Sequence, residues 1–292
     1  MSKSEVNEDS PIQRLPINSE QYTFNNWIIK FKKSHILNSM CTTPNICSDT
    51  TKDCCILCTY NKTLKLPHLP EMVFPNNILT LIHPAGGKIE FNTLDALKLV
   101  SNGRLPIQVA CAEAWKESRS PDHLEEKIRP FDWTFSTDYK GTLSEDISIE
   151  STEERIDLEK LKVKEKILFY QELMLFEDEL HDNGISSCTI KIRVMPSCFF
   201  ILLRFFLRVD NVMIRVNDTR YYHEFKTNYI IREYSSKECA FNLVKLPLTC
   251  FGDPNLLSPH MPLRTAVYEK LTFHNRKSEA CASGKSINGI QE

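Results

Sequence analysis

The chain has 292 residues, a formal net charge of −2 and 41% hydrophobic residues. This composition is ordinary for a soluble globular protein with a sizeable core, and the near-neutral charge excludes a broad basic field, so we expect neither a nucleic-acid nor a membrane partner. No apolar run in the first thirty residues is long enough for a signal peptide, and the eleven cysteines form no disulfide framework. We therefore expect a cytoplasmic protein with reduced thiols.

Polar segments flank the part of the chain that is expected to fold. Residues 1–19 and 275–292 are too polar to build a core, so we predict a disordered tail on either side of one domain, residues 20–274. Within that domain we predict a first strand at 24–31, followed by a cysteine-rich insert at 41–58.

A hairpin and a short helix are predicted next. Residues 78–82 and 88–91 alternate around the turn 84–87, and no helix start follows its glycines as a phosphate loop requires. Asn92 suits a helix cap, and Asp95 lies in the first turn, where a carboxylate meets the positive end of the helix dipole. The helix should close at 101–103, with later strands at 105–111 and 131–135 and a surface excursion between them.

A long amphipathic helix is predicted to begin at Ser151 or Asp157 and to end near Asp182. Ser151 and Glu154 have the spacing of a capping box, and the Asn-Gly pair at 183–184 supplies a left-handed stop. Leucines along the segment form an apolar stripe at helical spacing, so the helix should lie on the sheet.

The clearest pattern is a run of three strands between residues 181 and 224. From 199 to 209 every odd position is apolar, whereas Arg204 and Arg208 stand in the even row. A period of two indicates a strand, and the two arginines also exclude a membrane-spanning helix here.

The Asp210-Asn211 pair is predicted as a two-residue hairpin turn, after which Val212, Ile214 and Val216 resume the alternation. One more hairpin is expected from 221–224 to 229–233, and a last ordered segment at 266–271. The predicted fold class is α+β: an antiparallel β-sheet core with the long amphipathic helix and shorter helices packed on it, in a single domain.

The insert supplies the best metal-site signal. It contains Cys41, Cys47, Cys54, Cys55 and Cys58. Cys55 and Cys58 form a CxxC pair that could hold zinc, with Cys41 and Cys47, or His35 and His68, completing a tetrahedron. Five residues separate Cys41 from Cys47, unlike the tight pairs of a strong zinc motif, and no βαβ context favours redox use. Incidental thiols in a disordered insert are the favoured interpretation, with zinc and redox chemistry as alternatives and no cofactor expected.

A second cluster of titratable residues comes where the long helix is predicted to end. Its members are Glu177, Asp178, Glu179, His181 and Asp182. Glu177 and His181 have the i, i+4 spacing of metal ligands on a helix, but one pair is not a site. We favour a surface network satisfied by basic neighbours, with a basic partner or a metal as alternatives. No GxSxG, P-loop, HExxH or GxGxxG motif is present, so a binding protein is predicted rather than an enzyme.

Long words of the sequence resemble the TIPRL-type TOR-signalling regulators, a family that binds catalytic subunits of type 2A protein phosphatases. They include LPEMVF at 69–74, VACAE at 109–113, TDYKGTL at 137–143, LFEDELHDNG at 175–184 and KIRVMPS at 191–197. The resemblance spans about 24–273 and becomes loose after Tyr234. It lapses at the insert 41–58, where the family has a shorter segment without these thiols.

The resemblance implies a non-enzymatic domain with a groove that receives the catalytic subunit of a type 2A-like serine/threonine phosphatase, including its carboxy-terminal tail. It also implies restraint of the phosphatase in TOR signalling, and an alpha-four-type phosphatase-associated protein as a further partner. A metal- or thiol-dependent redox switch built on the insert is the alternative function.

Four residues match positions that the family uses for phosphatase binding. They are Asp95 in the DAL word, Ile156 in the IDLEKL word, and Val216 and Asp218 in the VNDTR word. Val216 departs from a methionine, which shortens the side chain but keeps the contact apolar. Asp218 is expected at a rim just beyond the third strand, so that Asp218→Asn with Val216→Asp should abolish binding and spare the fold. A helix start for Asp95 and an Asx turn for Asp218 are the structural alternatives.

Overall fold

The computed structural model describes residues 18–41, 47, 54–64, 66, 68–100, 134–162 and 165–273. The predicted carboxy-terminal tail 275–292, the strand 105–111 and the excursion that follows it lie outside these residues. So do residues 101–103, where the short helix was expected to close, and 131–133 of a further predicted strand.

Two antiparallel sheets form the protein, and every strand pairing among the described residues is antiparallel. The five-stranded sheet has the order β1 (Asn18–Phe24), β2 (Trp27–Lys33), β4 (Ile78–Ile82), β5 (Lys88–Asn92) and β6 (Thr142–Leu143). The eight-stranded sheet has the order β3 (Met72–Val73), β8 (Phe169–Asp178), β9 (Gly184–Val194), β10 (Cys198–Val209), β11 (Met213–Glu224), β12 (Tyr229–Ala240), β13 (Leu263–Phe273) and β7 (Ile147–Ser151).

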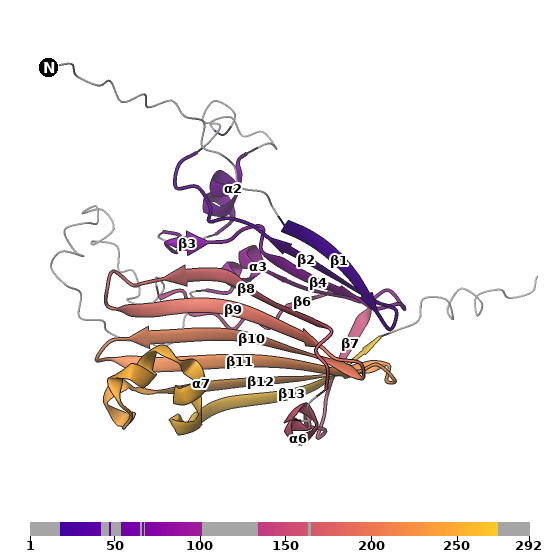
Figure 1. Cartoon of the computed structure of the whole chain (residues 1–292). Coiled ribbons are helices and arrows are strands. Elements are labelled where there is room, and N and C mark those ends of the chain that lie inside the picture. The colour runs from indigo at the N-terminus through magenta and orange to yellow at the C-terminus, as the bar shows by residue number, and fades with distance from the viewer. Residues whose placement is uncertain are drawn as a thin grey trace, which may run out of the picture.

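Helices are short in the part of the chain that the structure describes. They are α2 (Ile56–Thr63), α3 (Thr93–Lys98), α6 (Leu158–Lys162) and α7 (Pro254–Leu257), with 3-10 turns at Phe241–Leu243, Leu248–Gly252 and Ser258–His260. Figure 1 shows α7 lying across the face of the eight-stranded sheet and α6 beside one end of it. None of these helices is long and apolar enough to cross a bilayer.

The main core lies between the two sheets. The odd positions of β10, predicted to be buried, are all at most 3% exposed: Phe199, Ile201, Leu203, Phe205, Leu207 and Val209. They pack in one cluster with residues of the five-stranded sheet such as Ile29, Leu81 and Phe91. Each fully buried side chain of this size contributes about 1.5–3 kcal/mol of transfer free energy, so this interface is the main stabilising feature.

A buried hydrogen bond joins the two sheets within that core. The indole Nε1–H of Trp27 on β2 donates to Nε2 of His223 on β11 at 2.9 Å. The other ring nitrogen, Nδ1, lies 2.7 Å from the carbonyl oxygen of Tyr229. Because a carbonyl only accepts, the proton of the neutral ring sits on Nδ1, which leaves Nε2 as the acceptor.

The predicted order of strands is largely confirmed. The hairpin β4–β5, the Asn92-capped helix α3 and the three strands between 181 and 224 are present, although α3 already ends at Lys98. The first strand, predicted at 24–31, is wrong as a single element, because Asn25 and Asn26 adopt φ of 45° and 70° and turn the chain into a β1–β2 hairpin. Strand β1 also begins inside the predicted tail 1–19.

The long amphipathic helix is wrong, and the fold is therefore more β-rich than predicted. Among the described residues of that segment, only α6 is helical, and its Asp157 cap accepts hydrogen bonds from the N–H groups of Glu159 and Lys160. Strand β8 occupies 169–178, and a register shift at Met174/Phe176 breaks its alternation, so that Leu173, Leu175 and Phe176 are all buried. Pairing with β9 outweighs the intrinsic helix propensity of Glu, Leu and Met.

The interpretation of Glu177 and His181 as a metal-binding pair is also wrong, because it depended on the predicted long helix. Asp178 is 2% exposed and accepts hydrogen bonds from the N–H groups of Leu180 and Glu71. Leu180, His181 and Asp182 all adopt positive φ in the turn from β8 to β9. The acidic cluster therefore spans the end of β8 and the turn that follows it, where the i, i+4 geometry of a helix does not exist.

His223 predicts a pH dependence of stability. Burial lowers its pKa to about 4, whereas an unfolded chain titrates near about 6.5. Between these values the unfolded state binds more protons, so acidification from pH 6.5 to 4 should remove about 3 kcal/mol of unfolding free energy. Urea denaturation at pH 7 and pH 5 should show a smaller loss in His223→Gln than in the native chain. If His223→Gln lost as much unfolding free energy between pH 7 and pH 5 as the native chain, His223 would not be its source. The same conclusion would follow if the exposed-site control His181→Gln reduced the loss equally.

Candidate functional site

The eight-stranded sheet has a second face, turned away from the five-stranded sheet, which we call the outer face. Two apolar clusters lie on it. The cap cluster, formed with the segment 241–261, contains Phe206, Ile214, Val216, Cys239, Val244, Phe251, Leu257 and Met261. The Ile156 cluster contains Ile156, Met195, Cys198, Tyr222 and Ile231. Between the clusters the outer face carries charged side chains.

A groove of about 530 Å³ lies on the outer face beside the cap. Strands β8, β9 and β10 line one part of it and residues 252–255 line another. Its apolar lining includes Phe200, Leu202 and Phe206 of β10, and Lys191 pairs with Glu172 across two of the strands at 3.0 Å. A groove with apolar and charged sides has the character of a peptide-binding or ligand-binding surface.

An ion pair fixes one wall of the groove. Arg204 donates through Nε and Nη2 to the two carboxylate oxygens of Asp218 at 2.6 and 2.8 Å, and through Nη1 to Oδ1 of Asn255 in the cap at 2.7 Å. The side chains of Arg204 and Asp218 are 11% and 3% exposed. This bidentate geometry is the strong form of a charge-assisted hydrogen bond, and it holds the cap against the sheet.

A lysine on β12 fastens the cap from the other side. Lys237 Nζ donates to the carbonyl oxygen of Ser258 at 2.6 Å. Burial lowers the pKa of Lys237 despite the nearby carboxylate of Asp218. Arg208 Nη1 also donates to the carbonyl oxygen of Phe251 at 3.2 Å, so three cationic side chains tie the cap to the sheet in addition to its apolar cluster.

The predicted rim position of Asp218 is wrong, and so is the alternative of an Asx turn. Asp218 lies in the middle of β11, paired with Arg204 of β10 and Ser235 of β12. Val216 is 1% exposed in the cap cluster, and Ile156 is 5% exposed with its N–H bonded to Glu233 Oε1 at 2.8 Å. The structure therefore places these three predicted residues on one outer face, but as buried supports of it.

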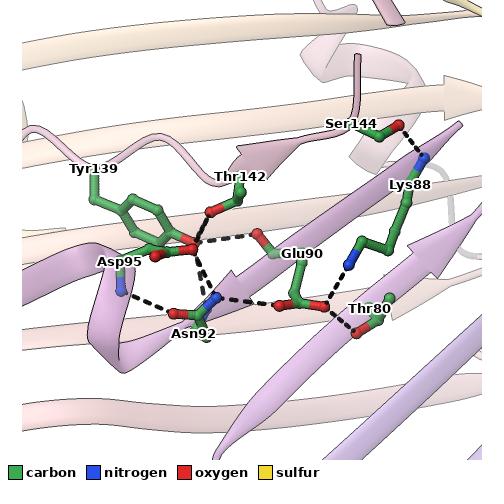
Figure 2. Close-up of polar contacts among 8 residues, drawn as sticks. All are labelled: Thr80, Lys88, Glu90, Asn92, Asp95, Tyr139, Thr142 and Ser144. Atoms are coloured by element: carbon green, nitrogen blue, oxygen red, sulfur yellow. Dashed lines mark hydrogen bonds and ion pairs between the residues drawn. The ribbon is translucent and has the colours of Figure 1, made fainter. Parts of the chain in front are cut away.

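Asp95 lies elsewhere, at the β5–β6 edge of the five-stranded sheet. Figure 2 shows its carboxylate accepting from the Thr142 hydroxyl at 2.7 Å and from Asn92 Nδ2 at 2.9 Å. Asn92 Oδ1 in turn accepts the Asp95 N–H at 2.8 Å, which confirms the helix-start interpretation. Burial raises the pKa of Asp95, but the hydrogen bonds from Thr142, Asn92 and Lys98 outweigh it, so the pKa is lowered overall.

The cysteine insert forms a third candidate. The Sγ atoms of Cys41, Cys47, Cys55 and Cys58 all lie within 4.8 Å of one another. A hydrogen bond from the Cys58 backbone lowers the pKa of Cys55, while bonding to the Cys55 sulfur raises the pKa of Cys58 to about 12. Among the described residues this group contains neither His35 nor His68, and His68 packs edge-on against Phe135 with Nδ1 3.0 Å from the carbonyl oxygen of Leu69.

Sequence reasoning missed the role of Arg204. In the sequence, Arg204 only interrupts an apolar run. The predicted two-residue turn at 210–211 would place position 204 opposite Asn217, so no ion pair with Asp218 was expected. The actual connection is one residue longer, with Val209 opposite Met213 and Asn211 at φ 60°. That shift brings Arg204 opposite Asp218 and turns Ile214 and Val216 to the outer face.

The buried Arg204–Asp218 pair predicts that replacing Asp218 lowers the unfolding free energy much more than replacing the more exposed Asp210. Asp218→Asn keeps the shape but leaves a largely buried guanidinium unpaired, so the unfolding free energy should fall by about 3 kcal/mol or more. Asp210→Asn removes the partner of Arg208 at a carboxylate that is 39% exposed, and should cost less than about 1 kcal/mol. Urea denaturation of both variants measures this, and equal losses would contradict it. Adding Val216→Asp should destabilise the protein further rather than spare the fold.

Comparison with known proteins identifies the family to which the chain belongs. The model of the TIP41-like family matches residues 72–245. The chain is 47% identical over 262 residues to the "TIP41-like protein" of Rattus norvegicus, covering 88% of this chain and 91% of that protein. It is 40% identical over 269 residues to "Type 2A phosphatase activator TIP41" of Saccharomyces cerevisiae, covering 84% and 71%, and 31% identical over 239 residues to "Type 2A phosphatase activator tip41" of Schizosaccharomyces pombe, covering 80% and 88%. The chain therefore belongs to the TIP41-like family.

Proposed function

We propose that this protein is a non-catalytic regulator that binds the catalytic subunit of type 2A-like serine/threonine protein phosphatases. The observation that carries the proposal is membership of the TIP41-like family, two of whose yeast relatives bear the name type 2A phosphatase activator. The outer face supports it physically, because it offers a shaped groove with mixed apolar and charged lining next to an anchored cap.

The carboxy-terminal tail of the catalytic subunit is the proposed occupant of the groove. An extended peptide fits a site in which strands supply a long, open surface and side chains alternate between apolar and charged along it. Phe200 and Leu202 would receive apolar side chains, while the Lys191–Glu172 pair and Arg204 would contact polar ones. The resemblance to TIPRL-type regulators supports this choice of occupant.

Burial divides the four predicted contact residues into two roles. Ile156, Val216 and Asp218 are at most 5% exposed, so they act by shaping the outer face and by aiming Arg204. Valine in place of the family's methionine is accommodated, since the cap cluster packs around position 216. Asp95, whose side chain is 28% exposed, retains an accessible carboxylate and is the one of the four available for direct contact with the catalytic subunit.

Further parts of the proposal rest on the resemblance alone. They are restraint of the phosphatase, a place in TOR signalling, a cytoplasmic location and an alpha-four-type protein as an additional partner. The names of the two yeast relatives state activation instead of restraint. Direction is therefore tested separately from binding.

A variant that fills the groove should weaken binding of the phosphatase tail without affecting the contacts made elsewhere on the catalytic subunit. Thr189 lines the groove on β9, and Thr189→Tyr should fill it while keeping a good strand residue. Thr265→Tyr, at an exposed position of β13 in the same sheet, is the matched control. Calorimetry against the catalytic subunit with and without its tail should show tail-dependent binding for the native chain and the control, weakened about tenfold, or about 1.4 kcal/mol, in Thr189→Tyr.

Two outcomes of that titration would count against the proposal. Equal weakening of both forms of the catalytic subunit by Thr189→Tyr would place the tail outside the groove. Absence of binding by the folded native chain to either form would reject the phosphatase as a partner. Thermal transitions of both variants serve as the check that each is folded.

The direction of regulation has its own measurement. We expect saturating protein to lower the turnover of the isolated catalytic subunit on a phosphopeptide, because a bound regulator restricts access and motion at the catalytic face. The control is Thr189→Tyr at the same concentration, which should restore turnover toward the free enzyme. A rise in turnover with the native chain would reverse the direction to activation while leaving the binding proposal intact.

A further inference from the structure

The cysteine insert brings four sulfur atoms together from segments that sequence spacing keeps apart. Cys55 and Cys58 bracket the first turn of α2, and Cys41 and Cys47 come from the chain before it. All four Sγ atoms lie within 4.8 Å of one another, and the Cys55 and Cys41 sulfurs are 3.6 Å apart. The five residues between Cys41 and Cys47, which argued against zinc in the sequence, do not prevent convergence.

These separations suit a tetrahedral thiolate site. With zinc–sulfur bonds of about 2.3 Å, two sulfurs on a tetrahedron are about 3.8 Å apart. The spacing of Cys41 and Cys55 is close to that edge length, so small adjustments of side-chain rotamers can place all four sulfurs on one ion. Four cysteine sulfurs with tetrahedral geometry select Zn²⁺ or an iron–sulfur cluster among biological metals.

The surroundings of the sulfurs supply a hydrogen-bond donor and a cation that would support metal-bound sulfur. The backbone N–H of Cys55 donates to Cys47 Sγ at 3.2 Å, a type of bond that supports the charge on a metal-bound sulfur. Cys55 is the cap residue of the eight-residue helix α2 and Cys58 lies in its first turn, so both belong to the positive end of the helix dipole. Lys62 supplies a cation nearby, with Nζ 3.5 Å from the carbonyl oxygen of Cys47.

The fifth cysteine of the insert provides an internal contrast. Cys54 precedes the helix cap and its Sγ accepts a hydrogen bond from Lys62 Nζ at 2.9 Å. It is not a member of the four-sulfur group. Cys54 and Cys55 are therefore adjacent in sequence but have different roles, which makes them a matched pair for substitution.

We propose that Cys41, Cys47, Cys55 and Cys58 form a structural Zn²⁺ site. The ion would close the insert and hold α2 in place, so that Tyr60 and Leu64, which are 4% and 5% exposed, reach the main core. A helix of eight residues is marginal by itself in water, and four metal bonds supply the constraint that its length does not. Zinc has no redox chemistry, so the site stabilises and does not switch.

Zinc content and matched variants test the proposal. The full chain, purified under reducing conditions without chelator, should contain one zinc per chain by elemental analysis. Cys54→Ser should keep that zinc, whereas Cys55→Ser and Cys58→Ser should lose it. Replacement of zinc by Co²⁺ should give the intense visible absorption of a tetrahedral thiolate site in the native chain and in Cys54→Ser only.

A second measurement on the native chain remains decisive if a cysteine variant fails to fold. Native alkylation mapped by mass spectrometry should modify Cys54 readily and the four ligands only after a strong chelator is added, and the chelator should lower the melting temperature. Zinc retained by folded Cys55→Ser, stoichiometric iron, or a Cys41–Cys55 disulfide in the zinc-free protein would each overturn the proposal. Equal alkylation of all five cysteines without chelator would do the same.

Discussion

The packing of one face of β10 and β11 against the five-stranded sheet is the constraint on which the rest of the molecule depends. Side chains alternate across a strand, so the face that holds Phe199 and Tyr221 in the core leaves only the opposite face for recognition. The Trp27–His223 hydrogen bond adds a polar contact to the interface that only a neutral imidazole can make. Core and candidate site are therefore the two sides of the same strands.

The outer face is organised by charge pairing in the same register. Arg204 stands opposite Asp218 because the β10–β11 connection has three residues, and the pair then reaches Asn255 in the cap. An insertion or deletion of one residue in that turn would separate the two and exchange the faces of β11. Val216 and Asp218, two of the residues carried over from the family, are buried on this face, and the groove beside them offers an accessible surface.

Period-two patterns gave reliable predictions where strands are regular, as in β10 and the β4–β5 hairpin. They failed where a local irregularity changes the count: the shift in β8 interrupts its alternation, and the longer turn after Val209 hid the Arg204–Asp218 pair. The four candidate contact residues came from the resemblance, and the burial of Ile156, Val216 and Asp218 came only from the structure. The sequence named Cys41, Cys47, Cys55 and Cys58 among the possible zinc ligands, but its spacing argued against the site, and only the structure brings the four sulfurs together and leaves Cys54 out of the group.

Hydrogen exchange of the protein with and without a type 2A phosphatase catalytic subunit tests the central claim most directly. In the segment 252–257, where the cap borders the groove, the exposed or half-buried residues Gly252, Asp253, Asn255 and Leu256 carry amides that report on occupancy there. The account predicts slower exchange in this segment on complex formation, with little change at the Asn25-Asn26 turn of the five-stranded sheet. Protection confined to that turn and β1, with 252–257 unchanged, would contradict the outer face as the binding surface.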